Sequence, residues 1–203
     1  TKLPAVPKDC SNIRKWVDGV VESSLESLNI NKIYGILFHN PNQLLTSYGA
    51  ELYTALDKYK QKDIISKIGI SIYSPSQLDL LLPKFSIDIV QTPFNLIDRR
   101  ILNSGWLEKL SNKNIEIHVR SVFLQGLLLM PHSNIPNKFS NWDSVWMKWN
   151  NWLSDNKVSA VHACLSFVES FKEVDKIIVG VDSLNHFEQI IQAMRKLPIK
   201  NVI

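Results

Sequence analysis

The sequence predicts an α/β protein built on a parallel sheet, and three observations lead to that prediction. Short apolar runs alternate with amphipathic segments along the chain, which is the pattern of βαβ units. The 203 residues are enough for one buried core, and 45% hydrophobic with 21% charged residues is an ordinary globular balance. No stretch approaches the roughly 18 apolar residues that a membrane-spanning helix needs. We therefore expect one domain covering residues 1–203.

Strands are expected where a short apolar run is bounded by polar or turn-forming residues. The first is the tail of a strand in the opening sequence TKL. The others are expected at residues 33–38, 65–73, 87–95, 115–123 and 174–181. Each of these strands precedes a helical segment, so the order of elements is that of a parallel sheet.

Helices are expected where apolar residues recur every three or four positions. Ser11 is the expected N-cap of the first, and Ser74 with Pro75 begins another. The helical segments are residues 11–28, 49–62, 74–85, 97–113, 140–156, 159–171 and 183–197. Within residues 140–156 four tryptophans share one helical face, and we expect them to pack on the protein or on a neighbouring subunit rather than to bind substrate.

Two architectures fit this order of elements, an open doubly wound sheet and a (β/α)8 barrel. No G-x-G-x-x-G motif follows a strand, which counts against a doubly wound dinucleotide-binding fold. In a barrel, the residues at the C-terminal ends of the strands face the active site. These ends carry polar or glycine-rich residues here, namely Lys2, His39, Ser71, Gln91, Arg120 and the turn at Gly180. The pattern favours the barrel.

Several stretches, taken in order, now resemble one family. They are VESSLESLNINKIYGILFHNP, KIGISIYSPSQLDLLL, DIVQTPFNLIDRR, HVRSVFLQGLLL and IIVGVDSLNHFEQ. In this order they resemble the aldo-keto reductases, with TK at the start of the chain similar to the end of that family's third strand. The resemblance implies an incomplete (β/α)8 barrel of about six βα units, with the first two missing. We expect such an N-terminally truncated chain to be inactive by itself.

The resemblance also implies an activity, the transfer of hydride from a nicotinamide cofactor to an aldehyde or ketone. NADPH is the expected cofactor, and NADH is not excluded. The family uses a Tyr, Lys, His and Asp tetrad, of which Lys2 and His39 match positions in this sequence. A buried ammonium lowers the pKa of a neighbouring tyrosine that donates the proton, and His39 would orient the substrate carbonyl. The Asp and Tyr belong to the missing units.

The resemblance extends to the residues that hold the cofactor. Ser71 and Gln91 match the pair that binds the carboxamide, and Arg120 stands where an aromatic ring often stacks on the nicotinamide. Four residues match the loop near the pyrophosphate: Ser121, Phe123, Leu124 and Gly126. Six match the turn and helix at the adenosine end: Gly180, Val181, Asp182, Ser183, His186 and Gln189.

Four departures from the family pattern accompany these matches. Ile72 replaces the usual Asn after the serine, and Gln189-Ile190 replaces a Glu-Asn pair. Gly180 and His186 stand where Lys and Arg often grip a 2′-phosphate, and Asp182 would repel that group. The departures at Ile72 and Ile190, together with the missing units, support an alternative, a non-catalytic reductase-like subunit that binds or regulates a partner.

Charge and cysteine content limit the partners. The net charge of +4 is spread without a long run of like charges, so we expect no nucleic acid partner. Two cysteines cannot form a disulfide framework, and no signal peptide is visible, which favours a cytoplasmic protein. His118, His132, His162 and His186 lack the spacing of metal ligands, so each is expected to be a surface or hydrogen-bonded histidine. A barrel hydrolase that uses His39 with a metal is disfavoured, because no strand end offers an acidic or histidine partner set. We expect a small-molecule carbonyl substrate, no membrane partner and possible oligomers.

Overall fold

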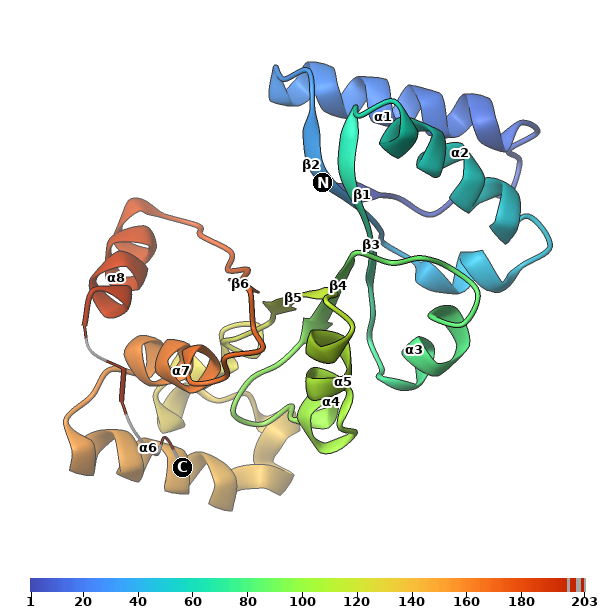
Figure 1. Cartoon of the computed structure of the whole chain (residues 1–203). Coiled ribbons are helices and arrows are strands. Elements are labelled where there is room, and N and C mark those ends of the chain that lie inside the picture. Colours follow the sequence, from blue (N-terminus) through green and yellow to red (C-terminus); the bar gives the residue numbers. More distant parts are fainter. Residues whose placement is uncertain (197, 200–201, 203) are drawn as a thin grey trace. The chain divides into compact units, whose positions relative to one another are not determined.

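The computed structural model describes residues 1–196, 198–199 and 202. Its parallel strands are hydrogen-bonded in chain order, which confirms the predicted α/β class (Figure 1). The strands are β1 (Lys2–Leu3), β2 (Ile33–Phe38), β3 (Ile65–Ser71), β4 (Ile89–Pro93), β5 (Glu116–Arg120) and β6 (Lys176–Ile177). The strand predicted at residues 65–73 ends at Ser71, and that predicted at 174–181 is reduced to two residues.

Helices occur at every predicted place. The α-helices are α1 (Ile13–Leu28), α2 (Gly49–Gln61), α3 (Ser76–Leu81), α4 (Arg100–Asn103), α5 (Trp106–Asn112), α6 (Asp143–Asn156), α7 (Ala160–Glu169) and α8 (Leu184–Met194). The end predicted for the last helix, residue 197, lies outside the described residues. Four 3₁₀ helices were not predicted: η1 (Pro41–Leu45), η2 (Leu127–Leu129), η3 (His132–Asn134) and η4 (Asn137–Trp142).

Three details of the predicted helices were wrong. The N-cap of α1 is Asn12, whose side chain accepts a hydrogen bond from Lys15 N at 2.9 Å, and not Ser11. Ser74 does not cap α3, because its hydroxyl lies 2.9 Å from that of Ser76. The helix predicted at residues 97–113 is two helices, because Gly105 between them takes φ +72°, outside the helical region.

The chain forms two compact units, and each is described by itself. The first comprises Thr1–Thr92 and Arg100–His118, and the second comprises Pro93–Arg99 and Val119–Ile203. Strands β4 and β5 contribute residues to both. No helix among the described residues is long and apolar enough to cross a membrane.

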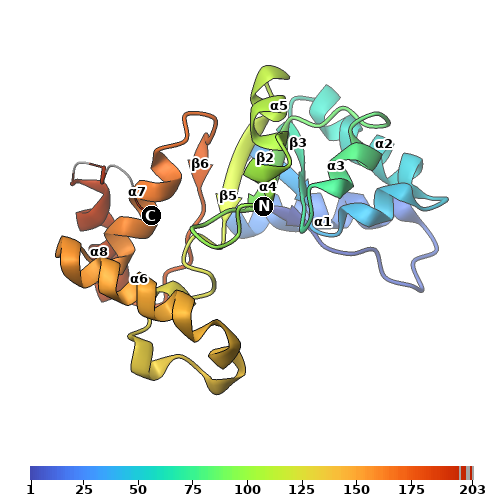
Figure 2. The ribbon, with the colours of Figure 1, turned by 90° about the horizontal axis from the view of Figure 1, so that it is seen from below.

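In the first unit, α1 and α2 pack side by side and cover strands β1 to β3 (Figures 1 and 2). The register aligns Leu3 with Phe38, Phe38 with Ile70, and Ile70 with Val90 across four strands. All four side chains are nearly or completely buried. This apolar row fixes the strand register, since a slip of one residue would turn the row to the other face.

Closer to the N-terminal ends of the strands, the sheet leaves little room for side chains. A Cβ atom added to Gly69 would lie 2.7 Å from the carbonyl oxygen of Ile89 and 2.9 Å from Cγ of Leu37. One added to Gly35 would lie 2.7 Å from Cδ1 of Ile89. Glycine is therefore required at position 69, where the backbone of β4 lies close, whereas at Gly35 the nearest atom is the end of a flexible side chain that can move.

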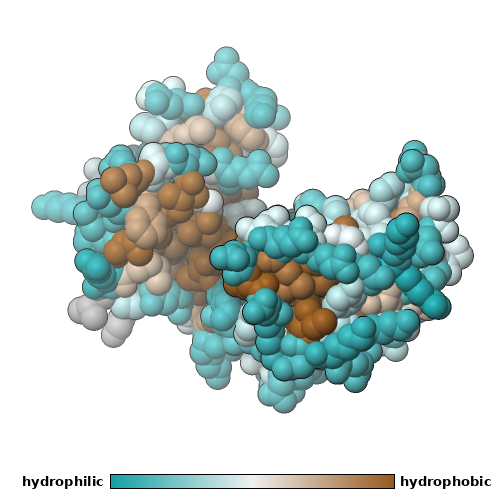
Figure 3. All heavy atoms as spheres, turned by 90° about the horizontal axis from the view of Figure 1, so that it is seen from above, coloured by the Kyte–Doolittle hydropathy of each residue, from teal (hydrophilic) through white to brown (hydrophobic). Residues whose placement is uncertain are grey.

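In the second unit, α7 is the central buried helix. It packs against α8 and η2, and Phe167 on α7 forms an aromatic cluster with Phe94 and Phe171. Hydrophobic side chains also remain visible on the surface of the protein among hydrophilic ones (Figure 3). Leu184 at the start of α8 is the most exposed large hydrophobic residue described, at 72%.

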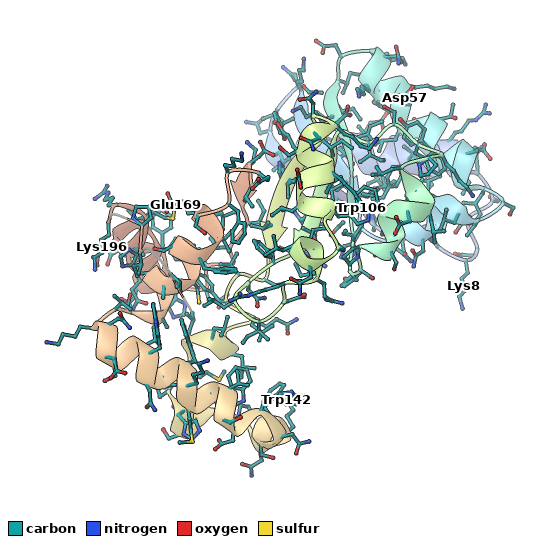
Figure 4. All side chains as sticks on the ribbon, turned by 60° about the horizontal axis from the view of Figure 1, so that its bottom comes forward. Lys8, Asp57, Trp106, Trp142, Glu169 and Lys196 are labelled. Carbon is teal, nitrogen blue, oxygen red and sulfur yellow. The ribbon has the colours of Figure 1, made fainter. Side chains whose placement is uncertain are left out.

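The tryptophan stripe packs within the second unit, as expected for a structural role. Trp146 and Trp149 are buried, and their indole N–H groups donate to carbonyl oxygens of Phe139 and Leu128 at 3.2 and 2.9 Å. Trp149 also stacks on Trp152, with ring centroids 5.8 Å apart. Trp142, labelled in Figure 4 just before α6, is half exposed.

Candidate functional site

Three of the residues predicted at strand ends lie side by side in the first unit. Ser71 is registered with Gln91, and His39 follows Phe38, which is registered with the residue before Ser71. The main-chain N–H of His39 donates to the carbonyl of Leu3 at 2.9 Å, which continues the pairing of β1 and β2 as far as His39. A polar row therefore runs along the C-terminal edge of β2, β3 and β4.

Ser71 and Gln91 are both buried, with 1% and 6% of their surface exposed. The Ser71 hydroxyl lies 3.4 Å from Oε1 of Gln91, a long hydrogen bond. Ile72, where the family usually has an asparagine, is completely buried in the apolar core. Its side chain offers no hydrogen bond to a ligand.

Lys2 lies on the same face as His39. It is registered with Leu37 on β2, and His39 is two residues further along that strand. Side chains two residues apart on a strand project from one face, so the ammonium and the imidazole project from the same side of the sheet. Lys2 is half-buried and His39 is exposed. The structure thus brings the two predicted catalytic residues to neighbouring strands.

His118 was not predicted as part of this edge. The Glu116 N–H donates to the Asp88 carbonyl at 2.9 Å, which sets Glu116 beside Ile89 and hence His118 beside Gln91. His118 is only 6% exposed, and its Nε2 lies 3.1 Å from Oε2 of Glu116. The sequence predicted a surface or hydrogen-bonded histidine here. The strand alternation of β5 could have indicated an inward position, but its register with β4 could not be predicted.

Glu116, two residues before His118 on β5, is the centre of a polar cluster. Its carboxylate accepts hydrogen bonds from Lys67, Tyr34 and His118, and the Lys67 ammonium lies 5.1 Å from the centre of the Tyr34 ring. Burial raises the pKa of Glu116, but the hydrogen bonds from Lys67, Tyr34 and His118 outweigh it and lower the pKa to about 2. The same pairing with Glu116 raises the pKa of Lys67. At neutral pH this cluster therefore holds a carboxylate and an ammonium.

The loop after β5 belongs to the second unit and has an unusual backbone. Ser121, Leu124 and Gln125 take positive φ values of 57°, 49° and 54°, and Gly126 takes 88°. Positive φ costs a non-glycine residue roughly 1 kcal/mol or more, and such strain is often found at ligand-binding loops. Here it is held by turn hydrogen bonds, such as that from Leu124 N–H to the Ser121 carbonyl at 2.8 Å.

Two further side chains support this loop. Asn95, for which no role was predicted, is 1% exposed and donates through Nδ2 to the Ser121 carbonyl at 2.9 Å. Its Oδ1 accepts from the N–H groups of Ile97 and Asp98 at 2.9 and 2.8 Å. Arg120 donates to the Ser121 hydroxyl at 3.3 Å. Asn95 thus ties the segment after β4 to the segment after β5.

A cavity of about 650 Å³ lies beside this loop, within the second unit. It is lined by the loop, by the start of α7 and by the segment from β6 into α8. Seven of the predicted cofactor residues line it: Ser121, Phe123, Gly126, Gly180, Asp182, His186 and Gln189. Leu124, Val181 and Ser183 lie within the same segments but are not among its lining residues, and neither is Arg120.

Two helix N-termini lie at this cavity. Ser159 caps α7 by accepting from His162 N–H at 3.3 Å, and Ser183 caps α8 by accepting from His186 N–H at 3.2 Å. Residues at the start of both helices line the cavity. Each N-terminus carries a partial positive charge and main-chain N–H donors, a combination that suits a phosphate group. The donors present therefore fit a dinucleotide pyrophosphate.

No group of three or more His, Cys, Asp or Glu side chains that could hold a metal ion occurs in the part of the chain that the structure describes. The two cysteines are free. Cys164 is buried on α7, and burial raises the pKa of its thiol to about 12.

Comparison with known proteins identifies the family. A sequence profile of the Aldo/keto reductase family matches residues 1–202. The chain belongs to the aldo/keto reductase family. A search of curated protein sequences finds no match.

Solved structures agree with the family. The chain is similar to the apo and holo forms of the aldo-keto reductase AKR11C1 from Bacillus halodurans, each with a TM-score of 0.73 and 17% identity over 98% of this chain and 67% of that one. It is also similar to the thermostable aldo-keto reductase Tm1743 in complex with epalrestat, with a TM-score of 0.70 and 16% identity over 93% of this chain and 64% of that one. The chain thus spans about two thirds of the length of these aldo-keto reductases, and its fold is an incomplete barrel.

Proposed function

We propose that this aldo-keto reductase chain is the cofactor-binding part of an oxidoreductase that transfers hydride from a nicotinamide dinucleotide to an aldehyde or ketone. The observation that carries the proposal is the cavity of the second unit, where a strained loop and two helix N-termini meet. Backbone N–H groups and the Ser121 hydroxyl are suitable donors for a pyrophosphate. The bound dinucleotide would supply the hydride.

The polar edge of the first unit supports a role in orienting the substrate. His39 is exposed and lies on the same face as Lys2, so its imidazole can donate a hydrogen bond to a carbonyl oxygen. The ammonium of Lys2 would stabilise negative charge on a nearby proton donor. Ser71 and Gln91 are buried beside this edge and are the proposed carboxamide ligands. We assign no proton donor among the residues of this chain.

The proposed cofactor is a nicotinamide dinucleotide, for which family resemblance alone suggests NADPH, with NADH as the alternative. The proposed substrate is a small carbonyl compound, and cytoplasmic location and possible oligomers stay predictions. A non-catalytic role is the second candidate, and one observation favours it: the completely buried Ile72 offers no hydrogen bond where the family has an asparagine. Such a subunit would bind the dinucleotide without turnover.

The experiment compares His39→Ala with the unchanged complete protein, measuring both cofactor affinity and the oxidation of reduced cofactor with a panel of aldehydes. Losing an oriented hydrogen bond to the transition state should lower kcat/KM by about 10² to 10³ while cofactor affinity stays the same. The matched control is His132→Ala, which removes a half-buried imidazole on η3 of the second unit and should leave kcat/KM unchanged.

Two outcomes would change the proposal. Equal kcat/KM for His39→Ala and the unchanged protein would remove His39 from the site. Binding of the dinucleotide without turnover by the unchanged protein would favour the second candidate.

A further inference from the structure

We propose that the cavity of the second unit selects a dinucleotide without a 2′-phosphate, so that the protein prefers NADH to NADPH. The inference rests on the proposed function and deepens it. It is drawn from the charges of the residues that line the cavity, and it runs against the cofactor that family resemblance suggests.

The described residues that line the cavity include no cationic side chain of the usual phosphate-binding kind. Among the described residues that form it there is no lysine and no arginine. The carboxylate in this described lining is that of Asp182, which is exposed just before the N-cap of α8. His186, in the first turn of α8, contributes an imidazole to the lining. The other described lining groups are neutral.

The positive potential of the cavity comes from the backbone. A helix N-terminus acts as roughly half a positive charge, so α7 and α8 together contribute about one. The carboxylate of Asp182 cancels about that much. The cavity is therefore close to neutral, and it binds a pyrophosphate through N–H donors rather than through a surplus of positive charge.

The two cofactors differ in the charge that they bring. NADPH carries a 2′-phosphate in addition to the pyrophosphate, and a phosphate monoester adds about −1.5 to −2 charges near neutral pH. With no lysine or arginine in the described lining to pair with it, this group would face the carboxylate of Asp182 without a counter-charge. NADH carries a ribose hydroxyl at the same place, which can donate a hydrogen bond to a carboxylate. The carboxylate of Asp182 thus disfavours NADPH and suits NADH.

The test is a calorimetric titration of the 203-residue chain with NADH and with NADPH at low ionic strength and mildly alkaline pH. We expect NADH to bind about tenfold more tightly, a ratio that falls as salt is added because screening weakens repulsion. Asp182→Asn should reduce the ratio, and His186→Arg should tighten NADPH binding selectively. Asp155→Asn, an exposed carboxylate on α6 outside the cavity lining, is the matched control and should leave the ratio unchanged.

The outcomes separate this inference from the proposed function. Equal or tighter binding of NADPH, or a ratio that Asp182→Asn leaves unchanged, would overturn the NADH preference while leaving the dinucleotide site in place. Binding of neither cofactor by a chain with normal far-ultraviolet circular dichroism would overturn the dinucleotide site itself, and the preference with it.

Discussion

Replacing Glu116 by glutamine should destabilise the first unit through the loss of one charge. The carboxylate accepts hydrogen bonds from Lys67, Tyr34 and His118, so residues on β2, β3 and β5 meet at this side chain. Glutamine keeps the size and one acceptor oxygen but removes the negative charge. The hydrogen bonds would then lose their charge assistance, and the Lys67 ammonium would lose its partner.

The pKa of Glu116 sets the size of the effect. A decrease in pKa from 4.5 to about 2 corresponds to at most about 3 kcal/mol. The Lys67 and Glu116 side chains are 31% and 20% exposed, so solvent screening reduces this figure. We expect Glu116→Gln to lower the free energy of unfolding by about 1–2 kcal/mol at neutral pH.

Urea unfolding followed by circular dichroism measures this difference. Because the pKa of Glu116 is lowered by folding, its contribution is fully present above about pH 4.5 and is lost as the pH falls toward about 2. The difference between the two proteins should shrink over that interval. The control is Glu51→Gln, whose ion pair with Arg14 at 3.2 Å is exposed at 45% and 64%, and which should cost under about 0.5 kcal/mol. An equal decrease in the free energy of unfolding for Glu116→Gln and Glu51→Gln at neutral pH would refute this reasoning.

The remaining predictions concern packing and thiol chemistry. Gly69→Ala should destabilise the chain by about 2 kcal/mol or more, because the new Cβ would lie 2.7 Å from a backbone oxygen of β4, whereas Gly19→Ala in the open interior of α1 should stabilise it by about 0.5–1 kcal/mol. Thermal unfolding of both variants tests this pair, and a similar change in Tm for the two would contradict it. Cys164 should resist iodoacetamide in the folded chain because its thiol is buried and its pKa is raised to about 12, while the half-buried Cys10 should react first. Mass spectrometry of the labelled protein decides, and fast labelling of Cys164 would contradict the burial.

The fold could be predicted well because its signals are local. The stripe of α1 and the apolar run of β2 are each contained in a few consecutive residues, and the structure has both where the sequence predicted them. Helix ends were less certain, because Ser11 and Asn12 are both good cap residues and only the backbone conformation chooses between them. The break at Gly105 was missed because a single glycine inside a helical pattern is often tolerated.

The candidate site could be predicted only in part. Strand ends identified His39 and Ser71, because position within a strand is a local property. The Glu116 cluster could not be predicted, since it depends on the register of β5 with β4 and on the side chains of Tyr34 and Lys67, which extend to Glu116 from β2 and β3. The positive φ of Leu124 could not be predicted, because nothing in the residue type indicates it.

The most direct test of the account is to map the binding of NADH on the 203-residue chain by NMR. We expect the largest shift changes at backbone amides lining the cavity of the second unit, including those of Ser121, Gly126 and Gly180. Amides of α1 and α2, which belong to the first unit, should change little. Saturable binding whose shift changes avoid these cavity amides, or no binding at all by the folded chain, would contradict the claim that this cavity is the cofactor site.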